Sequence, residues 1–336
     1  MASWMTLRAS RARPPGAAAS DPARAATYQA ALHQAEELAA AAARLSPASQ
    51  PLPLFYALSQ AGRAVAAARG AQDGRGRRGH GLRLTGVSET VFKSTVEPTR
   101  DGQFQDVSDA TNSPRLTGQV AIGAAVSSLP ALAHRLRFRS PWPGCLQAWP
   151  DPPLPLGLPG MTGPVQVIHG PDLPRPPGME RAIVIFGPEV KTPDQVAALL
   201  TNYPDARGAR PQQSLGAPPG VIARFDTPGG TGLPVLWPKR SDGSDPLPPA
   251  YAPDAESRLT PRWLRPGVGA GDALPIPLMT WWVILYGLSM FARYHPLEWL
   301  RALDLNASSE AVPIEVILAE ALEAVPTLVA EAVGLW

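Results

Sequence analysis

Apolar residues recur at three- and four-residue steps near the start of the chain, the spacing of helices that bury one face. Asp21 and Pro22 supply an N-cap and a first-turn proline for a helix that the pattern extends to Leu45. A second helix is predicted from about Pro53 to Arg69. The short break between the two helices predicts an antiparallel hairpin.

The C-terminal part of the chain returns to the same helical spacing. Residues 278–303 and 309–335 predict two further helical segments. The first hundred residues hold 13 basic and 6 acidic groups, whereas residues 301–336 hold 1 and 6. This opposite charge suits N- and C-terminal helices that pack together, and it is equally consistent with separate solvated faces.

The middle of the chain alternates apolar and polar residues in short runs, which is typical of strands. Residues 82–123 predict short strands, and Ser127 or Ser128 then begins a short helix. A proline-dense loop follows at 141–177, and beyond it residues 192–203 predict a helix. Strands are predicted around this helix, in the runs RAIVIF (181–186), VIARFD and LPVLW.

Together these elements predict the fold class α+β, with N- and C-terminal helices packed as one helical unit around a mixed, loop-rich α/β middle. We expect four divisions, in chain order a disordered leader at 1–20, a helical hairpin with short strands at 21–135, a Pro/Gly-rich α+β middle at 136–273, and helices at 274–336 that pack on the hairpin.

Composition narrows the classes of protein that remain. The 30 glycines and 41 prolines among 336 residues are enriched, yet they stay below the ~25–30% that marks disorder, so we expect long ordered loops. The net charge of +2 excludes a basic coat for nucleic acid. Most of the 30 basic residues are arginine, as in the proteins of a high-GC bacterium. The number of arginines is therefore not by itself evidence for a function.

Cys145 is the one cysteine, which excludes an internal disulfide and any multi-thiolate metal site, and it fits a reducing compartment. Residues 274–292 are nearly uncharged and about as long as the ~20 residues that cross a bilayer. Pro275 and Pro277 shorten the helix that can form there. We therefore expect a buried helix in a cytoplasmic protein without a membrane partner.

Signatures of the common enzyme classes are absent from the sequence. It has no phosphate-binding P-loop, no zinc-protease motif, no nucleophile elbow and no dinucleotide fingerprint. His33, His134 and His169 have no neighbour at the spacing of metal ligands. The sequence predicts neither a metal nor a cofactor.

One turn of the chain carries candidate chemistry. Arg75, Arg77 and Arg78 lie within five residues of His80 in a glycine-rich stretch. Guanidinium groups can hold a phosphate, and an imidazole can move protons near neutral pH, so the group could bind an anion or cleave RNA. The alternative interpretation is a solvated turn with His80 bonded to the backbone.

Three segments of the chain stand out together. They are FYALSQAGRA (55–64) with its preceding helix, GHGL (79–82), and LSMFARYHP (288–296) followed by Trp299. These segments resemble the YaaC-like family of bacterial proteins, whose activity is uncharacterised. The likeness follows the order of segments over most of residues 24–332. It implies a soluble cytoplasmic protein with helical ends, and it brings no established reaction.

Within these segments, Arg293 and His295 lie where a long apolar helix meets a proline. We predict that His80, Arg293 and His295 converge, as a structural anchor or as a site for a phosphate or carboxylate. The expected function is that of a binding or accessory protein in a nucleic-acid-related or phage-defence setting, with a nucleic acid or a protein as partner.

An enzymatic alternative remains. The terminal helices also resemble those of the HEPN ribonucleases, in which an arginine and a histidine cleave RNA without a metal. Here Arg75 and His80, or a composite site of Arg293 and His295, would take those roles. Oligomeric state is left open by the sequence.

Overall fold

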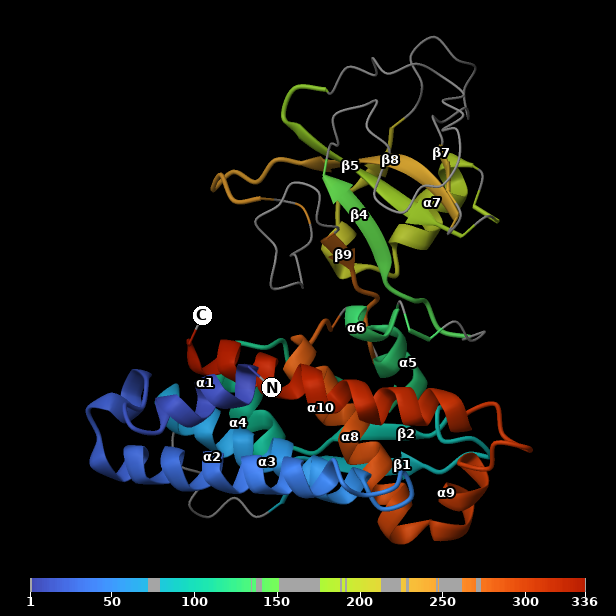
Figure 1. Ribbon diagram of the computed structural model, residues 1–336. Coiled ribbons are helices and arrows are strands. Elements are labelled where there is room, and N and C mark those ends of the chain that lie inside the picture. The colour runs from blue at the N-terminus through green and yellow to red at the C-terminus, as the bar shows by residue number, and fades with distance from the viewer. Residues whose placement is uncertain are drawn as a thin grey trace. The chain divides into compact units, whose positions relative to one another are not determined.

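The computed structural model describes residues 2–71, 79–133, 135–136, 141–150, 176–187, 189–190, 192–212, 225–227, 230–245, 247, 262–269 and 273–335. The chain forms two compact units (Figure 1). Unit 1 comprises residues Met1–Pro143 and Val268–Trp336, and unit 2 comprises Gly144–Gly267. Both chain ends therefore belong to unit 1, and the middle of the chain forms a unit of its own.

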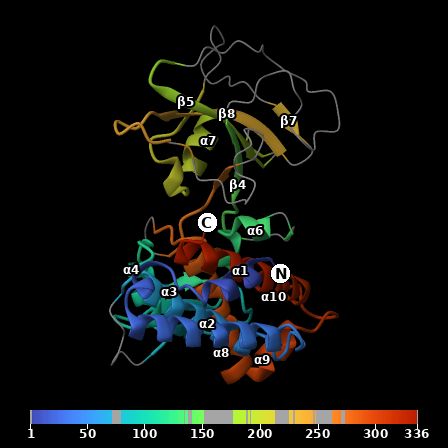
Figure 2. The same cartoon turned by 60° about the vertical axis from the view of Figure 1, so that its left-hand side comes forward.

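Helices make up most of the described part of unit 1. They are α1 (Ala2–Ser10), the 3-10 helix η1 (Gly16–Ala19), α2 (Pro22–Ala42), α3 (Pro51–Ala68), α4 (Gln103–Ala110), α5 (Ile122–Ser127), α6 (Pro130–Ala133), α8 (Pro277–Tyr294), α9 (Pro296–Ala302) and α10 (Ala311–Val333). Helices α2 and α3 run side by side in both views (Figures 1 and 2). The Asp21 carboxylate caps α2 by accepting the N–H groups of Ala23 and Arg24, as the sequence predicted.

Residues 2–10 form helix α1, which differs from the disordered leader that we expected at 1–20. Leu7 is fully buried in the core of unit 1, and Trp4 packs against that core. The Ser10 hydroxyl lies 2.6 Å from the Tyr28 hydroxyl of α2. Trp4 and Leu7 are three positions apart, so the apolar pattern covers only one helical turn and is too short to predict a helix. The contacts of α1 with α2 and α10 stabilise the helix instead.

Helix α8 contains most of the apolar run of residues 274–292, which is about long enough to cross a bilayer. Its side chains from Leu278 to Ser289 are buried, and it packs against α3 and α10. Among the described residues no helix combines the length and the apolar character needed to cross a bilayer. The run instead supplies the core of unit 1, where Trp281 and Trp282 are fully buried.

A small antiparallel sheet completes unit 1. It contains β1 (Leu82–Gly86), β2 (Thr95–Pro98) and β3 (Val120–Ala121) in that order. The sequence predicted only strands between residues 82 and 123, yet helix α4 lies between β2 and β3. Phe104 and Val107 are both buried, and their spacing of three residues fits a helix that packs on α3.

Unit 2 is built on a second antiparallel sheet. Its described elements are β4 (Leu146–Pro150), β5 (Met179–Phe186), α7 (Pro193–Leu200), the 3-10 helix η2 (Pro204–Ala206), β6 (Arg210–Pro211), β7 (Phe225–Thr227), β8 (Gly230–Pro238) and β9 (Arg262–Leu264). The strand order is β6-β8-β5-β4-β9, with β7 also paired to β8. Val196 and Leu200 of α7 belong to the same buried cluster as Val184 and Phe186, which are alternate residues of β5. The α+β prediction is thereby confirmed.

A buried carboxylate fastens the start of α10 to the connection between β1 and β2 in unit 1. Glu310 accepts the backbone N–H groups of Val91 and Phe92, each at 2.8 Å, and is itself 8% exposed. The Ser308 hydroxyl in turn accepts the N–H of Glu310. Two segments more than two hundred positions apart in the sequence are joined here through charge-assisted hydrogen bonds.

We expect the substitution Glu310→Ala to lower the free energy of unfolding by about 3 kcal/mol, because two buried N–H groups lose a charged acceptor. Glu310→Gln keeps one acceptor oxygen and should cost less. Urea unfolding followed by circular dichroism measures both. The exposed Glu315 of the same helix is the matched control, and an equal effect of Glu315→Ala would contradict this role for Glu310.

Unit 1 should also fold without unit 2. Its described core draws only on residues from Leu7 to Leu132 and from Val268 to Val333. The ends of unit 2 lie on paired neighbouring strands, with Leu146 opposite Leu264, so a flexible linker of about six residues can replace residues 144–267. We expect this variant to melt cooperatively, whereas residues 1–143 alone, without α8 and α10, should not. A molten excision variant would contradict the division.

Candidate functional site

His80 lies on a turn that is docked onto the beginning of helix α4. The Gln103 N–H donates to the Gly79 carbonyl at 3.3 Å, and the Phe104 N–H donates to the His80 carbonyl at 3.1 Å. These are free N–H groups of the first helical turn, which here has no side-chain cap. The turn that carries His80 therefore serves as the cap of α4.

Two glycines make this docking possible. Gly81 has a φ of 82°, and a Cβ built there would lie 2.9 Å from the backbone nitrogen of Phe104. Gly102 has a φ of 146°, and its Cβ would lie 2.4 Å from Gly81 Cα. Because both positions combine positive φ with backbone contact, a side chain at either would displace the turn.

Side-chain amides of α4 bond to α3 on one side and to the His80 turn on the other. The Ser59 hydroxyl of α3 donates to Gln103 Oε1 at 2.6 Å, and Gln103 Nε2 donates to the Ser59 carbonyl. Gln105 Nε2 donates to the carbonyls of Gly81 and Thr99, at 2.9 and 2.7 Å. The backbone around His80 is thus fixed to α3, α4 and the end of β2.

Aromatic rings surround the His80 imidazole. The ring centroids of Phe55, Tyr56 and Tyr286 lie 5.1, 6.0 and 6.1 Å from its own. Phe55 and Tyr286 are buried and lie 5.5 Å apart, whereas Tyr56 and His80 are partly exposed. The imidazole therefore rests on a wall made by α3 and α8 and keeps access to solvent.

Two guanidinium groups act on this imidazole. Burial lowers the pKa of His80 below its ordinary value of 6.5, and the positive charges of Arg293 and Arg63 lower it further. Arg63 belongs to α3 and Arg293 to the last turn of α8, and both side chains are exposed. At neutral pH the imidazole is therefore uncharged and the two arginines carry the positive charge.

Neither arginine is paired with a carboxylate among the described residues. The described contact of Arg293 is with Tyr294, whose ring centroid lies 4.8 Å from the guanidinium carbon. Tyr294 also lies close to Tyr286, whose pKa is raised by burial and then by Tyr294. We name Phe55, Tyr56, Arg63, His80, Tyr286 and Arg293 the His80 cluster.

The predicted site residues are placed as follows. Arg293 is near enough to His80 for its charge to lower the pKa of the imidazole. His295 ends α8 and packs on Phe291 at 5.5 Å, and among the described contacts it makes none with His80. Arg75, Arg77 and Arg78 lie outside the described residues, as does His134. The roles of all these residues stay predictions.

Four members of the cluster, Phe55, Tyr56, Arg63 and Tyr286, were not singled out as site residues by the sequence. Tyr56 and Arg63 lie within the FYALSQAGRA segment, so the resemblance contained them without assigning them a role. Tyr286 lies within the apolar run of α8, where the sequence pattern does not distinguish it from the core residues around it. The available signal is helical phase, since Arg63 follows Tyr56 by seven residues, or two turns, and shares its face of α3.

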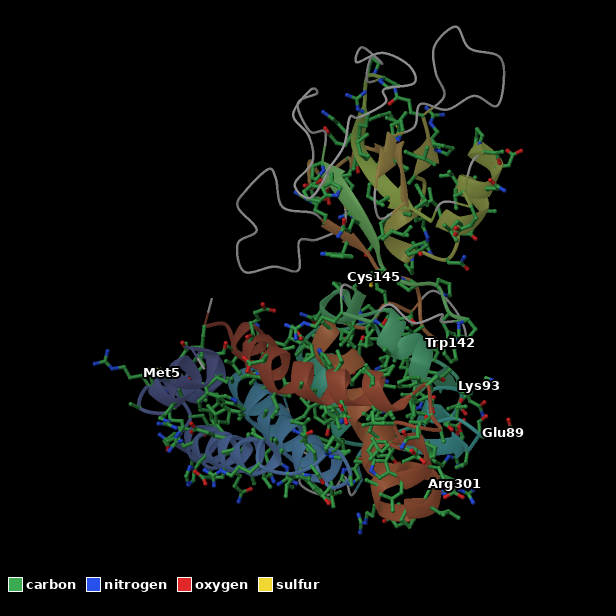
Figure 3. The ribbon with its side chains drawn as sticks, turned by 45° about the vertical axis from the view of Figure 1, so that its right-hand side comes forward. Met5, Glu89, Lys93, Trp142, Cys145 and Arg301 are labelled. Atoms are coloured by element: carbon green, nitrogen blue, oxygen red, sulfur yellow. The ribbon has the colours of Figure 1, made fainter. Side chains whose placement is uncertain are left out.

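The described residues give little support to metal binding or to a cysteine nucleophile. The described residues contain no group of three or more His, Cys, Asp or Glu side chains that could hold a metal ion. In unit 2, desolvation raises the pKa of the Cys145 thiol to about 12, so the thiol stays protonated at neutral pH and is a poor nucleophile. Cys145 is labelled in Figure 3.

The comparisons with known proteins agree with this division of the chain. A family model described as YaaC-like Protein matches residues 8–143 and 249–333. The chain belongs to the YaaC-like family. The match covers nearly all of unit 1, including the His80 cluster, and passes over residues 144–248 of unit 2. Searches of curated proteins and of solved structures gave no match.

Removing one of the two charges should be visible on His80 itself. We expect Arg293→Ala to raise the pKa of His80 toward 6.5, because one positive charge that opposes protonation is lost. A pH titration of the imidazole signals by NMR measures this, with His80→Gln identifying the signal. Arg44→Ala, an exposed arginine of the α2–α3 connection, is the control. An unchanged or lowered pKa in Arg293→Ala would show that the charges do not interact.

Proposed function

We propose that the protein binds an anionic ligand, a phosphate or a carboxylate, at the His80 cluster and works as a binding or accessory protein. The observation that carries this proposal is the pair of exposed guanidinium groups, Arg63 and Arg293, beside a partly buried neutral imidazole; within the described part of the chain neither guanidinium is paired with a carboxylate. An anion placed there offsets the repulsion between the two positive charges.

The chemistry of these groups suits such a ligand. A guanidinium forms paired hydrogen bonds with phosphate or carboxylate oxygens, and each charged hydrogen bond contributes about 1.5–3 kcal/mol. The neutral imidazole can donate one further hydrogen bond from its N–H. The contact with the Tyr294 ring restricts the orientations that the Arg293 guanidinium can adopt before the ligand arrives.

Structural anchoring, the competing interpretation of Arg293, has less support. An anchor would have its guanidinium bonded to backbone carbonyls or to a buried carboxylate, and the described contact of Arg293 is the exposed ring of Tyr294. Binding at this site also needs no overall positive charge, which matches the net charge of +2. The proposed setting remains cytoplasmic and nucleic-acid-related or phage-defence-related, where phosphate groups are common ligands.

Titration with sulfate tests the proposal, because sulfate keeps its charge over the pH range in which phosphate titrates. We expect Arg293→Ala and Arg63→Ala each to weaken binding by about 10- to 100-fold, the loss of one charged hydrogen bond. Thermal stability should stay nearly unchanged, and Arg44→Ala should bind normally. A sharp loss of stability in Arg293→Ala without loss of binding would restore the anchoring interpretation.

Binding should also tighten as the pH falls. A bound anion favours the charged imidazole, so it raises the lowered pKa of His80, and protonation therefore strengthens binding below about pH 6.5. His80→Gln should remove this pH dependence and keep part of the affinity. The ribonuclease alternative has its own result: cleavage of labelled RNA in EDTA that is lost in His80→Ala would contradict a purely binding role.

A further inference from the structure

Large apolar side chains are exposed mainly in one stretch of unit 1. Of the eight described large apolar residues that are exposed, five lie between positions 294 and 312. They are Tyr294, Leu297, Leu300, Leu305 and Val312. This stretch runs from the end of α8 through α9 to the first turn of α10. Exposed apolar groups gathered in this way are typical of an interaction surface.

Helix α9 presents one apolar face to the core and a second to solvent. Trp299 and Ala302 are 1% and 7% exposed, and the Trp299 indole N–H donates to the Ala48 carbonyl at 2.9 Å. Leu297 and Leu300, three residues apart on the other side, are 56% and 58% exposed. The indole contact fixes the rotation of α9, so the two leucines are held outward.

The outward face carries one charge of each sign. Glu298 and Arg301 are exposed, are spaced three residues apart, and form no described ion pair. Figure 3 shows Arg301 at the margin of unit 1. An anionic membrane or an acidic partner would call for an excess of basic groups, which this face lacks. A surface with equal and opposite charges is complementary to a second copy of itself.

We propose that the α9 face, Leu297, Glu298, Leu300 and Arg301, pairs with the same face of a second copy of this chain. In a two-fold arrangement the helices run antiparallel, so Glu298 of each copy faces Arg301 of the other while the leucines meet at the axis. A stable dimer buries about 800 Å² on each partner. The two turns of α9 give less, so the proposed pairing also needs neighbouring exposed side chains, for which Leu305 and Val312 are the next candidates along the chain.

Analytical ultracentrifugation over a range of protein concentrations provides the first test. The full chain should show a monomer–dimer equilibrium, and Leu297→Glu should shift it to monomer while the circular dichroism spectrum of the folded chain stays unchanged. Met5→Glu is the matched control, since Met5 is 69% exposed and lies at the opposite end of unit 1 in Figure 3. A chain that is monomeric throughout, or a dimer that Leu297→Glu leaves intact, overturns the proposal.

Charge reversal tests the antiparallel pairing itself. Glu298→Arg and Arg301→Glu should each weaken the dimer by at least tenfold, because like charges then face each other. The double reversal should restore it, and a mixture of the two single variants should form a heterodimer, because all facing pairs are again opposite in sign. Single reversals without effect, or a mixture that stays monomeric, would exclude this arrangement.

Discussion

The close crossing of α3 and α8 is the contact on which the rest of unit 1 depends. A Cβ at Gly62 of α3 would lie 2.4 Å from the Trp282 ring, so only glycine lets the indole pack against that helix. On another side of α8, a Cβ at Gly287 would lie 2.6 Å from Ile122 Cδ1 of α5. Two glycines thus set how near α8 comes to its neighbours, and at that separation Phe55 and Tyr286 meet.

The His80 cluster follows from this crossing. Helices α3 and α8 supply both the aromatic wall and the two guanidinium groups, while the turn that carries the imidazole is held by α4. The imidazole is neutral because the packing that orients it also takes it partly out of water, and because Arg293 and Arg63 add nearby positive charge. Stability and candidate chemistry are therefore connected, since the cap of α4 and the ring of His80 belong to one turn.

Local sequence was enough to predict the elements whose signals are local. Helix α2 has its own N-cap and a long apolar period, and the strand pattern of β5 is continuous. Helix α4 could not be predicted in this way, because its first N–H groups are capped by carbonyls from the His80 turn, about twenty positions earlier. In the site, the motifs pointed to His80 and Arg293, whereas Arg63 and Tyr286 acquire their place only through the crossing of α3 and α8.

The order of the chain has a consequence for its synthesis. Helix α3 emerges from the ribosome more than two hundred positions before α8, the helix against which it packs. At about 5–20 residues per second, the apolar face of the α2–α3 hairpin stays uncovered for roughly 10–40 s. In the sequence, unit 2 comes between α3 and α8, so its sheet can form during that interval. The apolar face of the hairpin is therefore fully covered only after α8 and α10, the last long helices, have been synthesised.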